Sequence, residues 1–161
     1  MNVPKFVLDV KLNGGLCNKL FHLFSACDIA IKNKYQILEP MFGWKQKILF
    51  SDIYNIDYFN ECMLKYTINY NLIIKKNDVS SQQKIIKNKF NLWKISENIL
   101  NIQRTTGKMD KNCMNIVVLL ALKINNKYLH LIDKYHDVFI HLRLESDWKQ
   151  YSRKKKLIIM K

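Results

Sequence analysis

Apolar and polar residues alternate along the first part of the chain in the two periods that distinguish strands from helices. Residues 5–12 place every second side chain on one apolar face of an extended strand: Phe6, Leu8, Val10 and Leu12. The segment Asn13-Gly14-Gly15 then interrupts the alternation. From Asn18 onward, apolar residues follow at spacings of three and four, which predicts a largely buried helix ending near residues 32–34. A strand, a glycine turn and a buried helix are the opening unit of Rossmann-like domains.

The remaining pattern predicts a mixture of short strands and helices. In chain order the expected elements are strands at 35–39 and 72–74, helices at 82–89, 90–102 and 111–126, and a strand at 137–144. Pro40 would end the strand at 35–39, and Ser80 or Ser81 could cap the helix that follows. Strands that alternate with helices in this way indicate an α/β fold with a Rossmann-like N-terminal domain.

The last predicted strand carries the side chains that are the strongest candidates for binding or catalysis. Its alternation places His141, Arg143 and Glu145 on one face, with leucines on the other. In open α/β sheets, ligands bind at the carboxyl ends of the strands, and the planar fork of an arginine there suits a phosphate or a carboxylate. The alternative interpretation is an exposed edge strand whose charged face forms ordinary ion pairs.

The charge of the chain raises a second class of function. The 161 residues carry a formal net charge of +14, and 12% are aromatic, which would suit a nucleic-acid-binding protein. However, the lysines are scattered, only residues 153–156 form a dense basic run, and no recognised nucleic-acid motif is present. Nucleic acid is therefore the less favoured partner.

Cysteines and apolar runs exclude further classes. Cys17, Cys27, Cys62 and Cys113 form no C-x-x-C pair and have no histidine at finger spacing, so we expect no metal site and no disulfide framework. There is no apolar run of 18 residues and no signal-peptide pattern at the N-terminus, which favours a cytoplasmic protein without a membrane partner.

Three stretches, in this order, resemble the GDP-fucose-dependent fucosyltransferases, especially the protein O-fucosyltransferase group. The first is the glycine loop Gly14-Gly15-Leu16-Cys17-Asn18-Lys19-Leu20, which is similar to the family loop that usually ends in Gly-Asn-Gln. The second is residues 50–59, Phe-Ser-Asp-Ile-Tyr-Asn-Ile-Asp-Tyr-Phe. The third and most specific is residues 141–148, in which an H-x-R strand is followed by Asp147-Trp148.

The resemblance implies a GT-B arrangement of two Rossmann-like domains and metal-independent, inverting transfer of fucose from GDP-fucose, without a cofactor. It implies catalytic roles for Arg143, against the β-phosphate of GDP, and His141, beside the phosphate or sugar. The opposite wall of the substrate site would be formed by the glycine loop and the residues after it: Gly14, Gly15, Leu16, Cys17 and Asn18. Asp147 is also assigned to the substrate site, where it would hold Arg143 or the cleft loop; a surface ion pair is the alternative.

The resemblance also predicts the domain organisation. Residues 1–105 would form the Rossmann-like N-terminal domain, and residues 106–161 a helix and the H-x-R strand that begin an incomplete second domain. In the family most of the second domain follows that strand, so we expect a truncated or N-terminal portion of a fucosyltransferase. Its acceptor would be an unidentified protein or glycan hydroxyl. The alternative is a non-catalytic remnant or binding module of the same fold.

Overall fold

The computed structural model describes residues 3–43, 47–67, 69–95 and 114–131. Contacts divide the chain into two units, Met1–Leu129 and His130–Lys161. Nearly all described residues belong to the first unit, and the fold below is that of this unit. The strand expected at 137–144 and the domain boundary expected between residues 105 and 106 lie outside the described residues.

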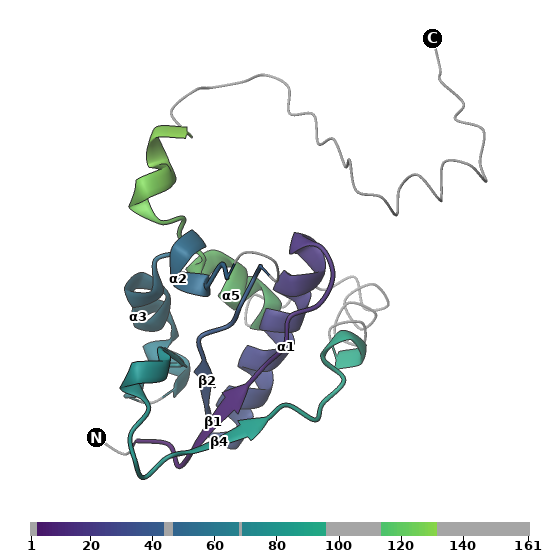
Figure 1. The fold of residues 1–161 in the computed structure, drawn as a ribbon, viewed down its shortest axis with the longest axis vertical. Coiled ribbons are helices and arrows are strands. Elements are labelled where there is room, and N and C mark those ends of the chain that lie inside the picture. The colour runs from purple at the N-terminus through teal and green to yellow at the C-terminus, as the bar shows by residue number, and fades with distance from the viewer. Residues whose placement is uncertain (1–2, 44–46, 68, 96–113, 132–161) are drawn as a thin grey trace, which may run out of the picture. The chain divides into compact units, whose positions relative to one another are not determined.

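Four short parallel strands form the sheet at the centre of this unit (Figure 1). They are β1 (Phe6–Asp9), β2 (Gln36–Leu38), β3 (Ile73–Ile74) and β4 (Lys84–Lys87), in the spatial order β3-β2-β1-β4. Leu8 pairs with Ile37 on one side and with Ile86 on the other. The predicted α/β class is confirmed, and the strand order is that of the first four strands of a Rossmann-like sheet.

The helix predicted after the glycine turn is α1 (Leu16–Asn33), and it covers one face of the sheet. Its apolar side chains join Leu8, Val10 and Leu12 of the first strand and its extension in one buried core, as the alternation predicted. Phe6 lies at the margin of this face, edge-on to Tyr35. The helix ends at Lys34, which adopts a left-handed conformation with φ of 56° and closes the last turn with bonds to Ala30 and Ile31.

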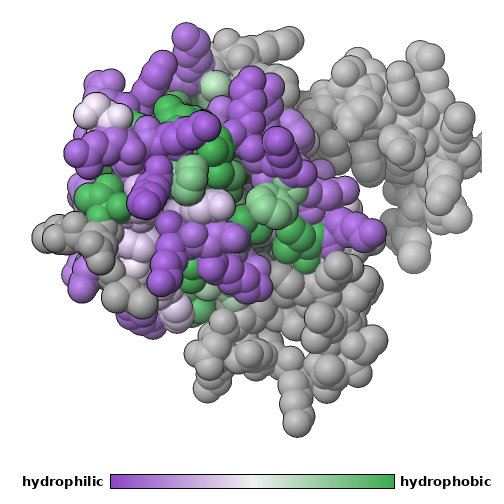
Figure 2. Space-filling view, turned by 90° about the horizontal axis from the view of Figure 1, so that it is seen from below, coloured by the Kyte–Doolittle hydropathy of each residue, from purple (hydrophilic) through white to green (hydrophobic). Residues whose placement is uncertain are grey.

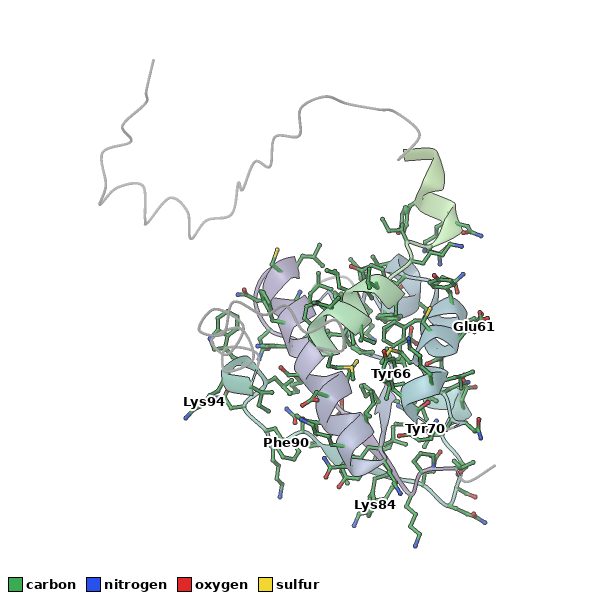
Figure 3. The ribbon with its side chains drawn as sticks, turned by 180° about the vertical axis from the view of Figure 1, so that it is seen from behind. Glu61, Tyr66, Tyr70, Lys84, Phe90 and Lys94 are labelled. Atoms are coloured by element: carbon green, nitrogen blue, oxygen red, sulfur yellow. The ribbon has the colours of Figure 1, made fainter. Side chains whose placement is uncertain are left out.

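Two helices complete the layer on this face: α3 (Ile56–Thr67), which follows the short α2 (Phe50–Ile53), and α5 (Met114–Ala121). α5 packs against both α1 and α3. Figure 1 shows α1 and α5 behind the sheet, and the opposite view in Figure 3 shows them in front of it. The other short helices are η1 (Lys76–Asp78) and η2 (Asn126–Leu131). The core therefore lies between the sheet and one layer of helices.

The helix predicted over residues 82–89 is wrong, because Lys84–Lys87 is the edge strand β4. The four residues pair in parallel with the whole of β1, from Phe6 with Lys84 to Asp9 with Lys87. Ser80 begins a turn rather than a helix, since its carbonyl accepts a hydrogen bond from the Gln83 amide at 3.0 Å. The β-branched pair Ile85-Ile86 suits the strand that this pairing with β1 creates.

The last two predicted helices are only partly described. The helix expected at 111–126 ends at Ala121 as α5, five residues early. Asn125 then donates from its main-chain amide to Ile53 at 2.8 Å, and from its side chain to the Ser51 carbonyl at 2.9 Å. These bonds to the α2 region replace the helical bonds that would extend α5. The helix expected at 90–102 is helical at residues 92–95, and the remainder lies outside the described residues.

One face of the described unit is mainly hydrophilic. Figure 2 shows hydrophilic residues over most of the face seen from below, with hydrophobic residues emerging between them. Among the residues that the structure describes, no helix is long and apolar enough to cross a membrane.

Candidate functional site

The carboxyl ends of the four parallel strands meet at one edge of the sheet, and two cavities open along this edge. The first, of about 490 Å³, lies where β1 and β4 end, and its lining includes Asp9 and Lys87. The second, of about 680 Å³, lies where β1 and β2 end, and its lining includes Asp9 and Leu38. This edge is where open α/β sheets bind their ligands.

The glycine loop lies at the same edge, between β1 and α1, and Gly14 is the residue that its shape requires. Gly14 has φ of +83°, which side-chain-bearing residues rarely adopt. A Cβ atom at this position would lie 2.7 Å from Nδ2 of Asn18 and 3.0 Å from its Cβ. The side chain of Asn18 therefore packs directly on the Gly14 backbone, and a larger residue at position 14 would displace it.

Gly15 has a different role from its neighbour. It is the N-cap of α1, with φ of −69° and ψ of 175°, and its carbonyl accepts the first helical hydrogen bond from the Lys19 amide at 3.0 Å. A Cβ atom at Gly15 would meet no atom within 4 Å. The conformation and the space at this position therefore both accept a side chain.

The first turn of α1 is open to a ligand. The side chains of Leu16, Cys17 and Asn18 are exposed, and no acidic residue stands in this turn. The amino end of an 18-residue helix carries partial positive charge, which favours an anion beside it. Lys19 donates from its ammonium group to the Phe42 carbonyl and so connects α1 to the chain after β2.

The predicted site is therefore described in part. The structure brings Gly14, Gly15, Leu16, Cys17 and Asn18 together at the carboxyl edge of the sheet. His141, Arg143 and Asp147 lie outside the described residues, so their roles stay predictions. Among the residues described, no three histidine, cysteine, aspartate or glutamate side chains cluster in a way that could hold a metal ion.

The family-like segment at residues 50–59 has a structural position. It forms α2 and the beginning of α3. Phe50, Tyr54 and Phe59 are buried in the core, whereas Tyr58 is exposed. The Phe50 ring contacts both Tyr54 and Phe59, with centroid distances of 5.3 and 5.1 Å. The buried aromatic residues of this segment therefore contribute to the core.

The cavity between β1 and β4 contains side chains that were not assigned to a site from the sequence. One of them is His22 of α1, which lines this cavity with Lys11 and Trp93. The Asn13 amide donates to Nδ1 of His22 at 3.2 Å, and burial lowers the pKa of His22. Because Nδ1 accepts this bond, a neutral imidazole carries its proton on Nε2. Knowing that β4 pairs with β1 would have located this cavity, because this pairing brings Lys87 beside Asp9.

Comparisons of the chain with protein-family models, with curated proteins and with solved structures found no match. The fold therefore defines a class: an α/β protein with a parallel, Rossmann-like sheet and a glycine loop at the carboxyl edge of that sheet.

Proposed function

We propose that the chain is a fucosyltransferase-like glycosyltransferase of the GT-B type, or a part of one, that transfers fucose from GDP-fucose to the hydroxyl of a protein or glycan. The observation that carries this proposal is the turn at Gly14, which has a left-handed backbone packed on Asn18 and leads into the exposed first turn of α1. This turn stands in the position where Rossmann-like proteins receive the phosphates of a nucleotide.

The chemistry follows from the charge that develops when GDP leaves. Breaking the bond between the sugar and the β-phosphate places negative charge on the phosphate oxygens while the fucose ring becomes cationic. A fixed arginine fork gains strength as this charge grows, so Arg143 would stabilise the transition state more than the bound substrate. In this proposal His141 stands beside the same phosphate, and the amides around Gly14 to Cys17 form the facing wall. The guanidinium supplies charge that a metal ion would otherwise supply, so transfer is metal-independent.

Calorimetric titration with GDP and with GDP-fucose tests the proposal. We expect the wild-type chain to bind both, with no change on addition of EDTA, and the Arg143→Ala and Gly14→Ala variants to lose binding. Lys84→Ala is the control, because this cation lies at the amino end of β4, at the other end of the strand from the edge that carries the glycine loop. Equal, undetectable binding by the wild type and Arg143→Ala would reject an active enzyme.

Transfer and binding are separable in the same experiment. Release of GDP from GDP-fucose in the presence of acceptor hydroxyls would support the enzyme. Binding without such release would favour a non-catalytic binding module of the same fold, which is the alternative that the sequence left open.

A further inference from the structure

The cavity where β1 and β4 end, called here the β1/β4 cavity, combines cations with exposed aromatic rings. Its cations are Lys11 and Lys87, and its rings are Phe90, with 48% of its surface exposed, and Trp93, with 47% exposed. The remaining lining residues are mostly polar: Asp9, Asn13, His22, Asn88, Asn91 and Leu92. Large aromatic side chains that remain half exposed beside lysines are typical of a binding surface rather than of a core.

The wall that carries the two rings is fixed on both sides. The Asn88 amide donates to the Asp9 carbonyl at 2.9 Å, and the Asn88 side chain makes two hydrogen bonds with the main chain of Phe90. The hydroxyl of Ser25, on α1, donates to the carbonyl of buried Leu92 at 2.8 Å. Phe90 and Lys94 lie on one side of α1 and Glu61, Tyr66 and Tyr70 on the other (Figure 3). The rings therefore need little reordering to receive a ligand.

His22 gives the same wall a directed donor. Its Nδ1 accepts from the Asn13 amide, so the proton of the neutral ring is on Nε2. The ring packs edge to face with Trp93, with centroids 6.2 Å apart. A neutral N–H donor suits a hydroxyl or a phosphate oxygen and is unsuited to abstracting a proton.

The position of the cavity in the sheet supports a ligand as well. From β1 the chain crosses through α1 to β2 on one side, and later returns with β4 on the other side of β1. Adjacent parallel strands whose connections leave in opposite directions define the switch point at which open α/β sheets bind phosphorylated compounds.

We propose that the β1/β4 cavity binds a phosphorylated sugar ring, with the phosphate between Lys11 and Lys87 and the ring against Trp93 and Phe90. Lysine ammonium groups are suitable point charges for a phosphate. The apolar faces of a sugar or base suit the aromatic rings, and the Asp9 carboxylate and His22 Nε2–H suit hydroxyl groups. A nucleoside monophosphate and a free sugar phosphate share this chemistry. The inference goes beyond the proposed fucosyl transfer and does not require it, since residues 14–18 do not line this cavity.

Calorimetry with ribose 5-phosphate, GMP, inorganic phosphate and unphosphorylated ribose tests the proposal. Lys87→Ala should weaken binding of ribose 5-phosphate and GMP by about tenfold or more, because it removes a charged partner of the phosphate. Lys84→Ala is the matched control, because Lys84 lies on the same strand at the amino end and does not line the cavity (Figure 3). Trp93→Ala should weaken binding of both compounds by about tenfold and leave inorganic phosphate unchanged.

The outcomes separate the ligand sources and the two proposals. GMP that binds more tightly than ribose 5-phosphate indicates a nucleotide, and equal binding indicates a free sugar phosphate. Failure of both compounds to bind, or equal affinity in the wild type and Lys87→Ala, would overturn the proposal. Inorganic phosphate that binds as tightly as ribose 5-phosphate would overturn the ring contact. If ribose 5-phosphate binds and GDP-fucose does not, only the proposed fucosyl transfer is rejected. If GDP-fucose binds and ribose 5-phosphate does not, only the proposed β1/β4 site is rejected.

Discussion

The side chain of Asn60 makes both main-chain hydrogen bonds of Ile73. Its Nδ2 donates to the Ile73 carbonyl and its Oδ1 accepts from the Ile73 amide, each at 2.9 Å, and both residues are buried. Ile73 belongs to β3, whose other edge pairs with β2. A side-chain amide of α3 therefore occupies the place that a fifth strand would take.

Replacing Asn60 with alanine should destabilise the fold by about 2 to 4 kcal/mol, because a buried donor and a buried acceptor would both lose their partner. The measurement is the free energy of unfolding from urea denaturation followed by circular dichroism. Asn77→Ala, at an exposed position of η1, is the control and should stay within about 0.5 kcal/mol. Equal denaturation midpoints for the two variants would contradict this role of Asn60.

Adjacent glycines should respond differently to the same substitution. Gly14→Ala places a side chain at φ of +83° and against Asn18, which we expect to cost about 1 to 2 kcal/mol or more. Gly15→Ala should change stability by about 0.5 kcal/mol or less, because a weaker N-cap is offset by a less flexible unfolded chain. Thermal unfolding of both variants checks the difference, and an equal loss at both positions would refute it.

Two cysteines of α1 should differ in reactivity. Cys17 is exposed in the first turn, whereas Cys27 is fully buried, and burial together with the neighbouring Asp28 charge raises the pKa of the Cys27 thiol. Since the thiolate is the reactive form, iodoacetamide should modify Cys17 and leave Cys27 unmodified in the native protein. Peptide mapping by mass spectrometry reads this result.

The same labelling experiment reports on the proposed donor site. If GDP-fucose binds at the glycine loop, it should slow the alkylation of Cys17 and leave the rate at Cys62, on α3, unchanged. Protection of neither cysteine at a saturating concentration would count against binding at this loop.

Stability should fall as the pH decreases below the ordinary pKa of histidine, in part because of His22. Burial lowers the pKa of folded His22, so the unfolded chain binds a proton first. The stabilising contribution is complete above pH of about 6.5 and is lost as the pH falls towards the folded pKa. His22→Gln should flatten this part of the curve of unfolding free energy against pH. A curve of unchanged slope would assign the effect to the other histidines.

Local pattern was sufficient for the first half of the sheet. β1 and α1 each show their period within a few residues, so Leu8, Val10 and Leu12 could be placed on the buried face from the sequence. β4 could not be predicted in this way, because Lys84-Ile85-Ile86-Lys87 is held by pairing with residues almost eighty positions earlier. The end of α5 has a similar cause, since the bonds from Asn125 to the α2 region lie about seventy positions away in sequence.

In the candidate site, too, the part formed by local sequence could be predicted and the part formed by distant residues could not. The loop from Gly14 to Asn18 is contiguous, so a turn between a strand and a helix could be predicted there from local sequence, while its ligand-binding role was predicted from the family resemblance. The β1/β4 cavity is assembled from Asp9, His22, Lys87 and Trp93, which the sequence separates widely. Because residues 82–89 were expected to be a helix, Lys87 could not be placed beside Asp9, and the cavity between β1 and β4 could not be predicted.

The hydrogen bonds between Asn60 and Ile73 make the two edges of the sheet unequal as places for a further strand to pair. The side of β3 away from β2 is occupied by a side chain, while within the described residues β4 pairs with β1 alone. Within the part of the chain that the structure describes, the outer edge of β4 is therefore where a further strand, from this chain or from a second copy, could pair. Lys84 and Lys87 stand at the two ends of that strand, so two β4 strands brought together would repel each other. The sheet is thus extensible on one side and protected there against pairing with itself.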